Sequence, residues 1–252
     1  MFRHQGKSRT VKHNLQIATV LSFVAGIVNV TGFLSLKQLT TNVTGHFALF
    51  IYDVSNLEFW RGTVYFLYIF SFFFGSFLSS FLIELFRENK KWNVYVLPTT
   101  IESLVLLSIG LLSNVVDIRY PDVIACLLLF AMGLQNSYVT KISNTIVRTT
   151  HLTGLFTDLG IEISQLLFPK SHPNREKLKS TIKLRIYIIS FFFAGGLAGG
   201  FFYSKIDLKL NTLIFAGLIL LLSLLYDDFR YKLIMARRKY RQSKKMQSAT
   251  SN

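Results

Sequence analysis

Six long apolar segments constrain this chain more than any other feature of its sequence. They cover residues 15–36, 63–86, 92–113, 122–142, 182–206 and 210–229. A helix needs roughly 20 apolar residues to cross a hydrocarbon core about 30 Å thick, and each segment reaches that length. Hydrophobic residues make up 51% of the chain and charged residues only 16%, a balance that a soluble domain rarely tolerates. The sequence therefore predicts an all-α, polytopic membrane protein with six transmembrane helices.

Basic residues are distributed unevenly around these segments. When those near the end of a span are counted with the adjoining loop, alternate connections hold 23 Lys and Arg against 5. Basic connections stay on the cytoplasmic side, so both termini are predicted there. This topology explains the net charge of +15 without a nucleic-acid partner. We divide the chain into an N-terminal tail (1–14), a single membrane domain (15–229) and a basic tail (230–252) that we expect to lie against anionic lipid headgroups.

The two halves of the membrane domain repeat each other. The motif TTNVTGHF at residues 40–47 returns as TTHLTGLF at residues 149–156. Other matches follow in the same order: Gly26-x-x-Asn29 with Gly133-x-x-Asn136, Asp53 with Glu162, and SFFFGS from Ser71 with SFFFAG from Ser190. Internal repeats in a hydrophobic chain are typical of transport proteins.

Each repeat, 15–113 and 122–229, holds three spans. Because three is odd, the second repeat must enter the membrane from the opposite side, so the repeats are predicted to be inverted. The apolar stretches at 45–52 and 155–168 are too short to cross. We interpret them as re-entrant half-helices, one entering from the outer face and one from the cytoplasmic face. Irregular backbone at that depth must be buried in protein or line a wet cavity.

The Thr-Gly pairs begin these half-helices. Thr44 can accept hydrogen bonds from free helix N–H groups, and Gly45 allows close backbone approach or an unusual φ. The positive end of a half-helix can also bind an anion or a carboxylate. The alternative is that these residues only cap short helices.

Glu102 lies midway along the third predicted span. A carboxylate at that depth is costly, so it is normally paired, protonated or functional. Its candidate partners are Lys141, His46 and His151. A structural hydrogen bond is the competing interpretation.

The predicted substrate or ion pathway combines Glu102 with the polar residues of the repeated motifs and the carboxylates that follow them. Its members are Asn29, Thr41, Asn42, Thr44, Gly45, His46, Glu102, Gln135, Asn136, Thr150, His151, Thr153, Gly154, Asp158 and Glu162. Asp158 and Glu162, like Asp53, are alternatively interfacial.

Small residues spaced four apart on the second and fifth predicted spans permit close helix crossing. They are Gly75 with Ser79, Ser76 with Ser80, Gly195 with Gly199, and Gly196 with Gly200. We predict a packing seam between the repeats, with a homo-oligomer face as the alternative.

The chain resembles the YoaK family of bacterial inner-membrane proteins, whose function is uncharacterised. AMGLQN at residues 131–136 and TTHLTG at 149–154 carry the resemblance most strongly, and it extends nearly to the basic tail. It implies about six spans in the bacterial cytoplasmic membrane. Asn29 stands where the family usually has Asp, and His46 where it usually has Asn. The first difference removes a carboxylate, and the second adds a group that titrates near neutrality.

The sequence favours a secondary transporter or permease for a small solute. It contains no HExxH, GxSxG or phosphate-cradling Gly-rich motif, so we predict no enzyme activity, cofactor, metal or catalytic residue. A driving ion, if any, would be a proton acting through Glu102 or the histidines. The alternatives are a non-transporting scaffold or lipid-interacting protein and an intramembrane enzyme. A transporter should have a polar cavity that joins Glu102 to both Thr-Gly segments, whereas a scaffold should keep these groups apart.

Overall fold

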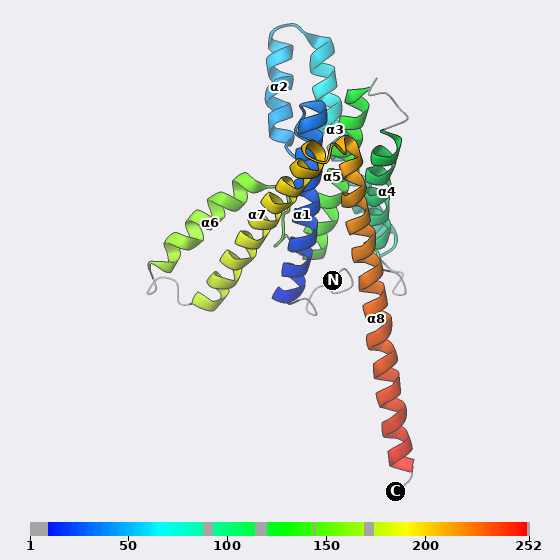
Figure 1. Ribbon diagram of the computed structural model, residues 1–252. Helices are drawn as coiled ribbons and strands as arrows, with labels where there is room; N and C mark the ends of the chain where they lie inside the picture. The colour runs from blue at the N-terminus through cyan, green and yellow to red at the C-terminus, as the bar shows by residue number, and fades with distance from the viewer. Residues whose placement is uncertain (1–9, 88–92, 114–119, 144, 169–173, 251–252) are drawn as a thin grey trace.

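The computed structural model describes residues 10–87, 93–113, 120–143, 145–168 and 174–250, and within these ranges every regular element is helical. The α-helices are α1 (Val11–Leu36), α2 (Val43–Ser55), α3 (Phe59–Leu85), α4 (Val96–Leu112), α5 (Pro121–Ser143), α6 (Leu152–Leu166), α7 (Arg175–Ser204) and α8 (Thr212–Thr250) (Figure 1). A short 3-10 turn, η2 (Lys209–Asn211), precedes α8. The predicted all-α class is confirmed.

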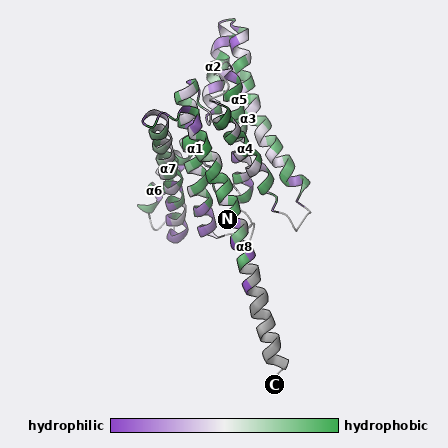
Figure 2. Ribbon diagram, turned by 45° about the vertical axis from the view of Figure 1, so that its right-hand side comes forward, coloured by the Kyte–Doolittle hydropathy of each residue, from purple (hydrophilic) through white to green (hydrophobic). Residues whose placement is uncertain are grey.

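Five helical segments of the described chain are long and apolar enough to cross a membrane. They are Lys12–Leu36, Phe59–Leu85, Pro121–Ser143, Arg175–Ser204 and Lys209–Asp227. Apolar residues cover most of the bundle they form (Figure 2). These lengths indicate a multi-pass membrane protein.

Helix α4 is shorter than the predicted third span. It has 17 residues and begins at Val96, whereas the prediction began at residue 92, which lies outside the described residues. Pro98 falls in its first turn, where a missing N–H costs no hydrogen bond, so the helix can start just before it.

Two helix pairs, α1 with α7 and α3 with α5, form the closest packing in the bundle. A Cβ added to Gly26 of α1 would lie 2.1 Å from the carbonyl oxygen of Phe192 on α7. A Cβ added to Gly133 of α5 would lie 2.1 Å from the carbonyl oxygen of Phe72 on α3. Only glycine permits such close backbone approach.

The partner helices contribute glycines to the same crossings. A Cβ on Gly75 would lie 2.1 Å from the carbonyl oxygen of Phe130, and one on Gly195 would lie 2.0 Å from that of Phe23. The predicted small-residue seams thus pack helices of the two halves against each other. By their position at the crossings, Gly75 of α3 corresponds to Gly195 of α7. Aligning the SFFFGS and SFFFAG motifs would instead match Gly75 with Ala194, one residue earlier.

Helices α4 and α8 also cross at glycines. A Cβ on Gly110 would lie 2.7 Å from Cγ1 of Ile214, and a Cβ on Gly217 would lie 2.7 Å from Cγ of Leu107. Each helix therefore places a branched apolar side chain over the other's glycine.

Helix α8 continues far beyond the predicted last span. We predicted a span ending at residue 229 and a separate basic tail, but the helix runs to Thr250. Hydropathy cannot detect this extension because it is polar, yet Lys, Arg, Gln, Met and Ala are good helix formers. Helix α7 likewise begins at Arg175 and not at residue 182, since Asn174 accepts a hydrogen bond from the backbone N–H of Lys177 at 3.2 Å.

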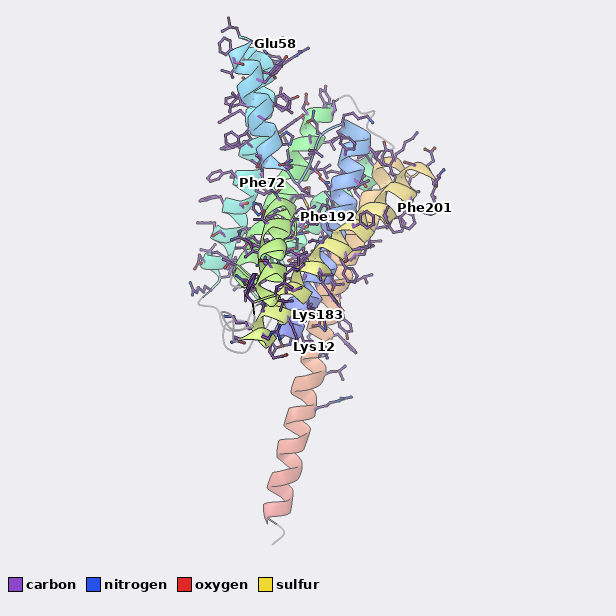
Figure 3. The ribbon with its side chains drawn as sticks, turned by 90° about the vertical axis from the view of Figure 1, so that its left-hand side faces the viewer. Lys12, Glu58, Phe72, Lys183, Phe192 and Phe201 are labelled. Atoms are coloured by element: carbon purple, nitrogen blue, oxygen red, sulfur yellow. The ribbon has the colours of Figure 1, made fainter. Side chains whose placement is uncertain are left out.

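The bundle has two distinct ends. Glu58, next to the start of α3, lies at one end, and Lys12 and Lys183 lie at the other (Figure 3). The turn between α2 and α3 is thus at the opposite end from the start of α1, in agreement with the alternation of basic and less basic connections.

Candidate functional site

A cavity of about 940 Å³ lies between the first turns of α2 and α6. The predicted pathway residues that line it are Asn29, Thr41, Asn42, Thr44, Gly45, Asn136, Thr150, His151, Thr153 and Gly154. Its apolar lining includes Phe72 and Phe192, whose carbonyls form the close crossings described above. The structure thus brings both Thr-Gly segments to one cavity.

Matching hydrogen bonds hold the two segments to the long helices. Thr41 Oγ1 donates to Oδ1 of Asn29 at 2.8 Å, and Thr150 Oγ1 donates to Oδ1 of Asn136, also at 2.8 Å. Each bond joins the segment after a helix to that same helix, α1 for Thr41 and α5 for Thr150. The repeated Asn and Thr residues therefore have a structural role at the cavity wall, in addition to lining it.

The starts of α2 and α6 face the cavity with different caps. Asn42 Oδ1 accepts a hydrogen bond from the backbone N–H of Gly45 at 3.2 Å. His151 precedes α6 and makes no side-chain capping bond. Helix N-termini carry free N–H groups and a partial positive charge, so both walls present hydrogen-bond donors.

Gly45 and Gly154 do not adopt the unusual φ that we considered for them. Both lie in the first turn of a helix, and neither adopts a left-handed conformation. A Cβ on Gly45 would lie 3.4 Å from Nδ2 of Asn42, which is ordinary contact, whereas a Cβ on Gly154 would lie 2.5 Å from Nδ1 of His151. The second glycine makes room for the histidine ring.

Arg148 is a cavity residue that the sequence analysis missed. It lies in the connection between α5 and α6, is exposed, and is the charged side chain in the cavity lining. It also lines a neighbouring cavity of about 240 Å³ together with His151, Gly154, Asp158 and Arg185. Its position just before the second Thr-Gly motif was a usable signal, but the first repeat has no equivalent cation.

Asp158 and Glu162 belong to an ion-paired cluster outside the main cavity. Arg185 on α7 donates through Nε and Nη2 to the two carboxylate oxygens of Glu162, at 2.8 and 3.0 Å. Its Nη1 lies 2.8 Å from Oδ2 of Asp158. The planar guanidinium suits this forked arrangement, which ties α6 to α7. Asp158 lines the neighbouring cavity of about 240 Å³, and neither carboxylate lines the main cavity.

Glu102 is also separate from the cavity. It is fully buried, and its Oε2 accepts a hydrogen bond from the hydroxyl of Tyr138 at 2.7 Å. None of the predicted partners contacts it: Lys141 pairs with Glu84 at 2.6 Å, His46 bonds to a backbone carbonyl, and His151 lines the cavity. The packing of α4 on α5, which sequence spacing does not specify, selects Tyr138. The cavity expected of a transporter was to join Glu102 to both Thr-Gly segments, but the cavity found here joins the two segments and does not include Glu102.

His46 is packed behind the cavity wall. Its ring lies against Tyr65 and Tyr68 of α3, and Nε2 donates to the carbonyl of Leu39 at 2.8 Å. Burial lowers the pKa of His46 and outweighs the effect of the bond to Leu39, which raises it. The neutral imidazole is therefore favoured here.

Two more predicted or alternative site residues are buried away from the cavity. Gln135 Nε2 donates to the carbonyl of Leu21 at 3.0 Å and to Thr149 Oγ1 at 2.9 Å. Asp53 is buried on α2 with Oδ2 lacking a hydrogen-bond partner among the described residues. Gln135 therefore fastens the second Thr-Gly segment to α1 and α5.

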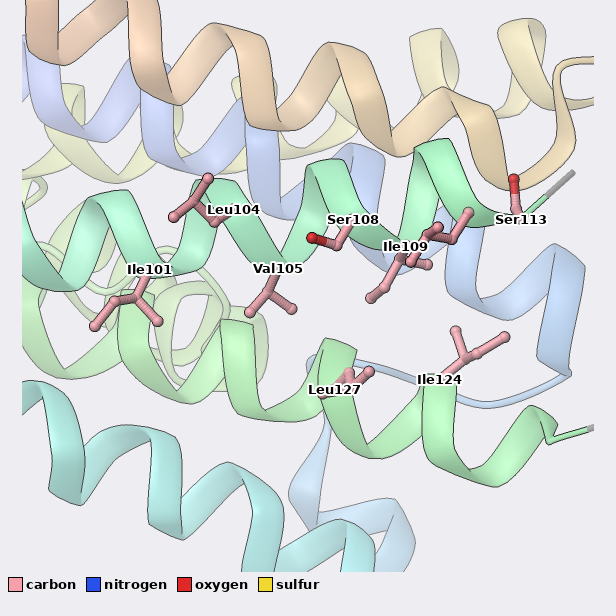
Figure 4. Close-up of a pocket in the computed structure, with 9 residues that line it drawn as sticks. Ile101, Leu104, Val105, Ser108, Ile109, Ser113, Ile124 and Leu127 are labelled. Atoms are coloured by element: carbon pink, nitrogen blue, oxygen red, sulfur yellow. The ribbon is translucent and has the colours of Figure 1, made fainter. Parts of the chain in front are cut away.

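A second kind of cavity lies between α4 and α5. It has a volume of about 400 Å³ and is lined by aliphatic side chains and two serines, among them Ile101, Ser108 and Leu127 (Figure 4). It has no charged group and does not touch the repeated motifs, so it is a weaker candidate for recognising a polar solute.

The chain belongs to the family described as protein of unknown function, DUF1275, whose model matches residues 17–226. This match is compatible with the resemblance to the YoaK family. No curated protein and no solved structure matches the chain.

Proposed function

We propose that this DUF1275 protein is a secondary transporter or permease for a small solute, built from two inverted repeats. The observation that carries the proposal is the cavity of about 940 Å³ lined by the Thr-Gly segments of both halves. Many secondary transporters place their substrate site between inverted repeats, where short or broken helices meet.

Paired contacts support the inverted repeat. The bond from Thr41 to Asn29 corresponds to the bond from Thr150 to Asn136. Glycines at helix crossings also correspond between the two halves: Gly26 to Gly133, Gly75 to Gly195, and Gly110 to Gly217. A relation of this kind assigns α1, α3 and α4 to one repeat and α5, α7 and α8 to the other. It counts α4 as the sixth span despite its length.

The half-helices of this proposal are α2 and α6, with 13 and 15 residues. Both are too short to cross a bilayer. Their first turns share the cavity, and in Figure 1 α2 leaves toward the upper end of the bundle while α6 leaves toward the lower end. We propose that they re-enter the membrane from opposite faces and gate the cavity on its two sides.

We propose that the protein lies in the bacterial cytoplasmic membrane with both termini in the cytoplasm. Reporter fusions after residue 252 and in the turn at Leu57 test this directly. A reporter fused after residue 252 should lie in the cytoplasm, and a reporter inserted at Leu57 should lie outside it. The same side for both fusions would contradict the inverted repeat.

Transport can be tested before the solute is identified. Purified protein in liposomes is given an osmotic jump with each member of a panel of small solutes, and entry is followed by stopped-flow light scattering. Wild-type protein should accelerate the entry of a subset of solutes. Ala48 lines the cavity on α2, and Ala48→Trp should return entry to the rate of protein-free liposomes.

Gly160→Trp is the matched control. Gly160 lies on the other half-helix, and a Cβ there meets nothing within 4 Å, so the same bulky residue should leave solute entry unchanged. If no solute enters faster than through protein-free liposomes, the transporter proposal fails and a non-transporting scaffold becomes the better interpretation.

A further inference from the structure

The charge of the main cavity is one-sided. Arg148 is its charged lining residue, and no Asp or Glu is among the residues that line it. No acidic side chain of the described residues pairs with Arg148, in contrast to Arg185, which is held by two carboxylates. A guanidinium that lies at a cavity wall and pairs with no described carboxylate repels a cationic solute and attracts an anionic one.

The backbone at the start of α6 adds hydrogen-bond donors on the same side. His151 provides no side-chain cap, and the first backbone bond there runs from the N–H of Leu155 to the carbonyl of His151. The N–H groups of the first turn therefore have no intrahelical acceptor, and residues 152–154 of this turn all line the cavity.

The amide oxygens of Asn29 and Asn136 at the wall each already accept one hydrogen bond. Oδ1 of Asn29 and Oδ1 of Asn136 each receive a threonine hydroxyl at 2.8 Å. The amide nitrogen of Asn29 is a further donor at the wall, whereas that of Asn136 already donates to the carbonyl of Met132 at 2.9 Å. The Asn29 amide nitrogen, the backbone N–H groups of the first turn of α6 and the Arg148 guanidinium thus place donors and one positive charge at the cavity wall.

We infer that the cavity binds a small anion, with Arg148 as its charge partner and the first turn of α6 as its main source of backbone donors. This inference rests on the proposed transport function for its physiological meaning, but the binding site is defined by the cavity alone. A volume of about 940 Å³ admits inorganic oxyanions and small organic carboxylates.

Binding is tested on purified full-length protein by thermal unfolding and isothermal titration calorimetry. The probes are sodium acetate, sodium phosphate and sodium sulfate, with glycerol as the neutral comparison and choline chloride as the cationic one, all at constant ionic strength and constant chloride. At least one anion should raise the melting temperature saturably. Glycerol and choline should not.

Arg148 variants identify the site. Arg148→Gln should weaken anion affinity by about tenfold or more, because a hydrogen bond to a charged group is lost, and Arg148→Lys should weaken it less. Arg61→Gln removes the same charge from an exposed residue outside the cavity and should leave affinity unchanged. Anion binding that ignores Arg148→Gln, or no anion binding by wild-type protein, overturns the inference.

The liposome assay separates this inference from the proposed function. Anion binding that depends on Arg148 without accelerated flux supports the site and contradicts transport. Accelerated flux of neutral or cationic solutes that is unaffected by Arg148→Gln supports transport and contradicts the anion site.

Discussion

Gly26 of α1 approaches Phe192 of α7 so closely that a Cβ on the glycine would lie 2.1 Å from the phenylalanine carbonyl oxygen. The obstructing atom belongs to the backbone of a long helix, so it cannot move aside as a side chain can. Gly26→Ala should therefore push the helices apart and lower the free energy of unfolding by about 1–3 kcal/mol, the scale of overpacking in a tight core. Thermal unfolding and membrane abundance measure this effect.

Gly160→Ala is the control for this prediction. Gly160 is also helical, but a Cβ there meets nothing within 4 Å. Alanine at this site should be neutral or slightly stabilising because it has the higher helix propensity. Equal stability of the two variants would contradict the close crossing.

Glu102 and Tyr138 should behave as a structural pair. Glu102→Gln keeps an oxygen that can accept the tyrosine hydroxyl, so abundance and solute flux should stay near wild type. Glu102→Leu removes that acceptor and should destabilise the bundle by about 1 kcal/mol. Loss of pH-dependent flux in an abundant, stable Gln variant would instead assign Glu102 a proton-carrying role.

The sequence predicted the cavity motifs because their chemistry is local and repeated. The bonded residues are close in sequence and recur in both halves, as Asn29 with Thr41 and Asn136 with Thr150. The repeat can therefore be recognised from their spacing. Arg148 has no counterpart in the first half, where Leu39 occupies the equivalent position, and a residue present once leaves no repeat signal. Its place at the cavity depends on how the helices pack in three dimensions, which the sequence does not specify.

Long-range partners could not be predicted for a different reason. Glu102 lies on α4 and Tyr138 on α5, and their contact depends on how these helices are rotated against each other. Hydropathy fixes the length of a span but not its rotation. The same limit applies to Arg185, whose carboxylate partners lie on α6, and to α8, whose polar continuation to Thr250 lies outside any hydropathy criterion.

The contact of His151 with Gly154 predicts an asymmetry between the two Thr-Gly motifs. Gly154→Ala places a Cβ 2.5 Å from the present position of His151 Nδ1 and should displace the ring, thereby reducing solute flux or anion binding. Gly45→Ala meets Asn42 only at 3.4 Å and should be nearly silent. A greater loss of flux in the Gly45 variant, with both proteins equally abundant, would contradict this geometry.

Arg185 should hold α6 against α7. Arg185→Gln removes the bonds to Glu162 and Asp158, so backbone amides of α6 should exchange hydrogen faster, which mass spectrometry detects segment by segment. Lys179→Gln is the control, since Lys179 is exposed on α7 and its partner Glu176 belongs to the same helix. Unchanged exchange in α6 of the Arg185 variant would argue against a clamp.

His46 should make the protein less stable in mild acid. Its folded-state pKa lies below the ordinary value of 6.5 because the ring is buried, so the unfolded chain binds a proton more readily than the folded one. The stability that depends on neutral His46 is therefore fully present above pH 6.5, and it falls as the pH drops from 6.5 through the folded-state pKa. His46→Gln should flatten this part of the curve of melting temperature against pH, although it loses ring contacts with Tyr65 and Tyr68. His151→Gln is the comparison, since its ring lines the cavity. If the His46 variant keeps the wild-type slope between pH 5 and 7, the titrating group lies elsewhere.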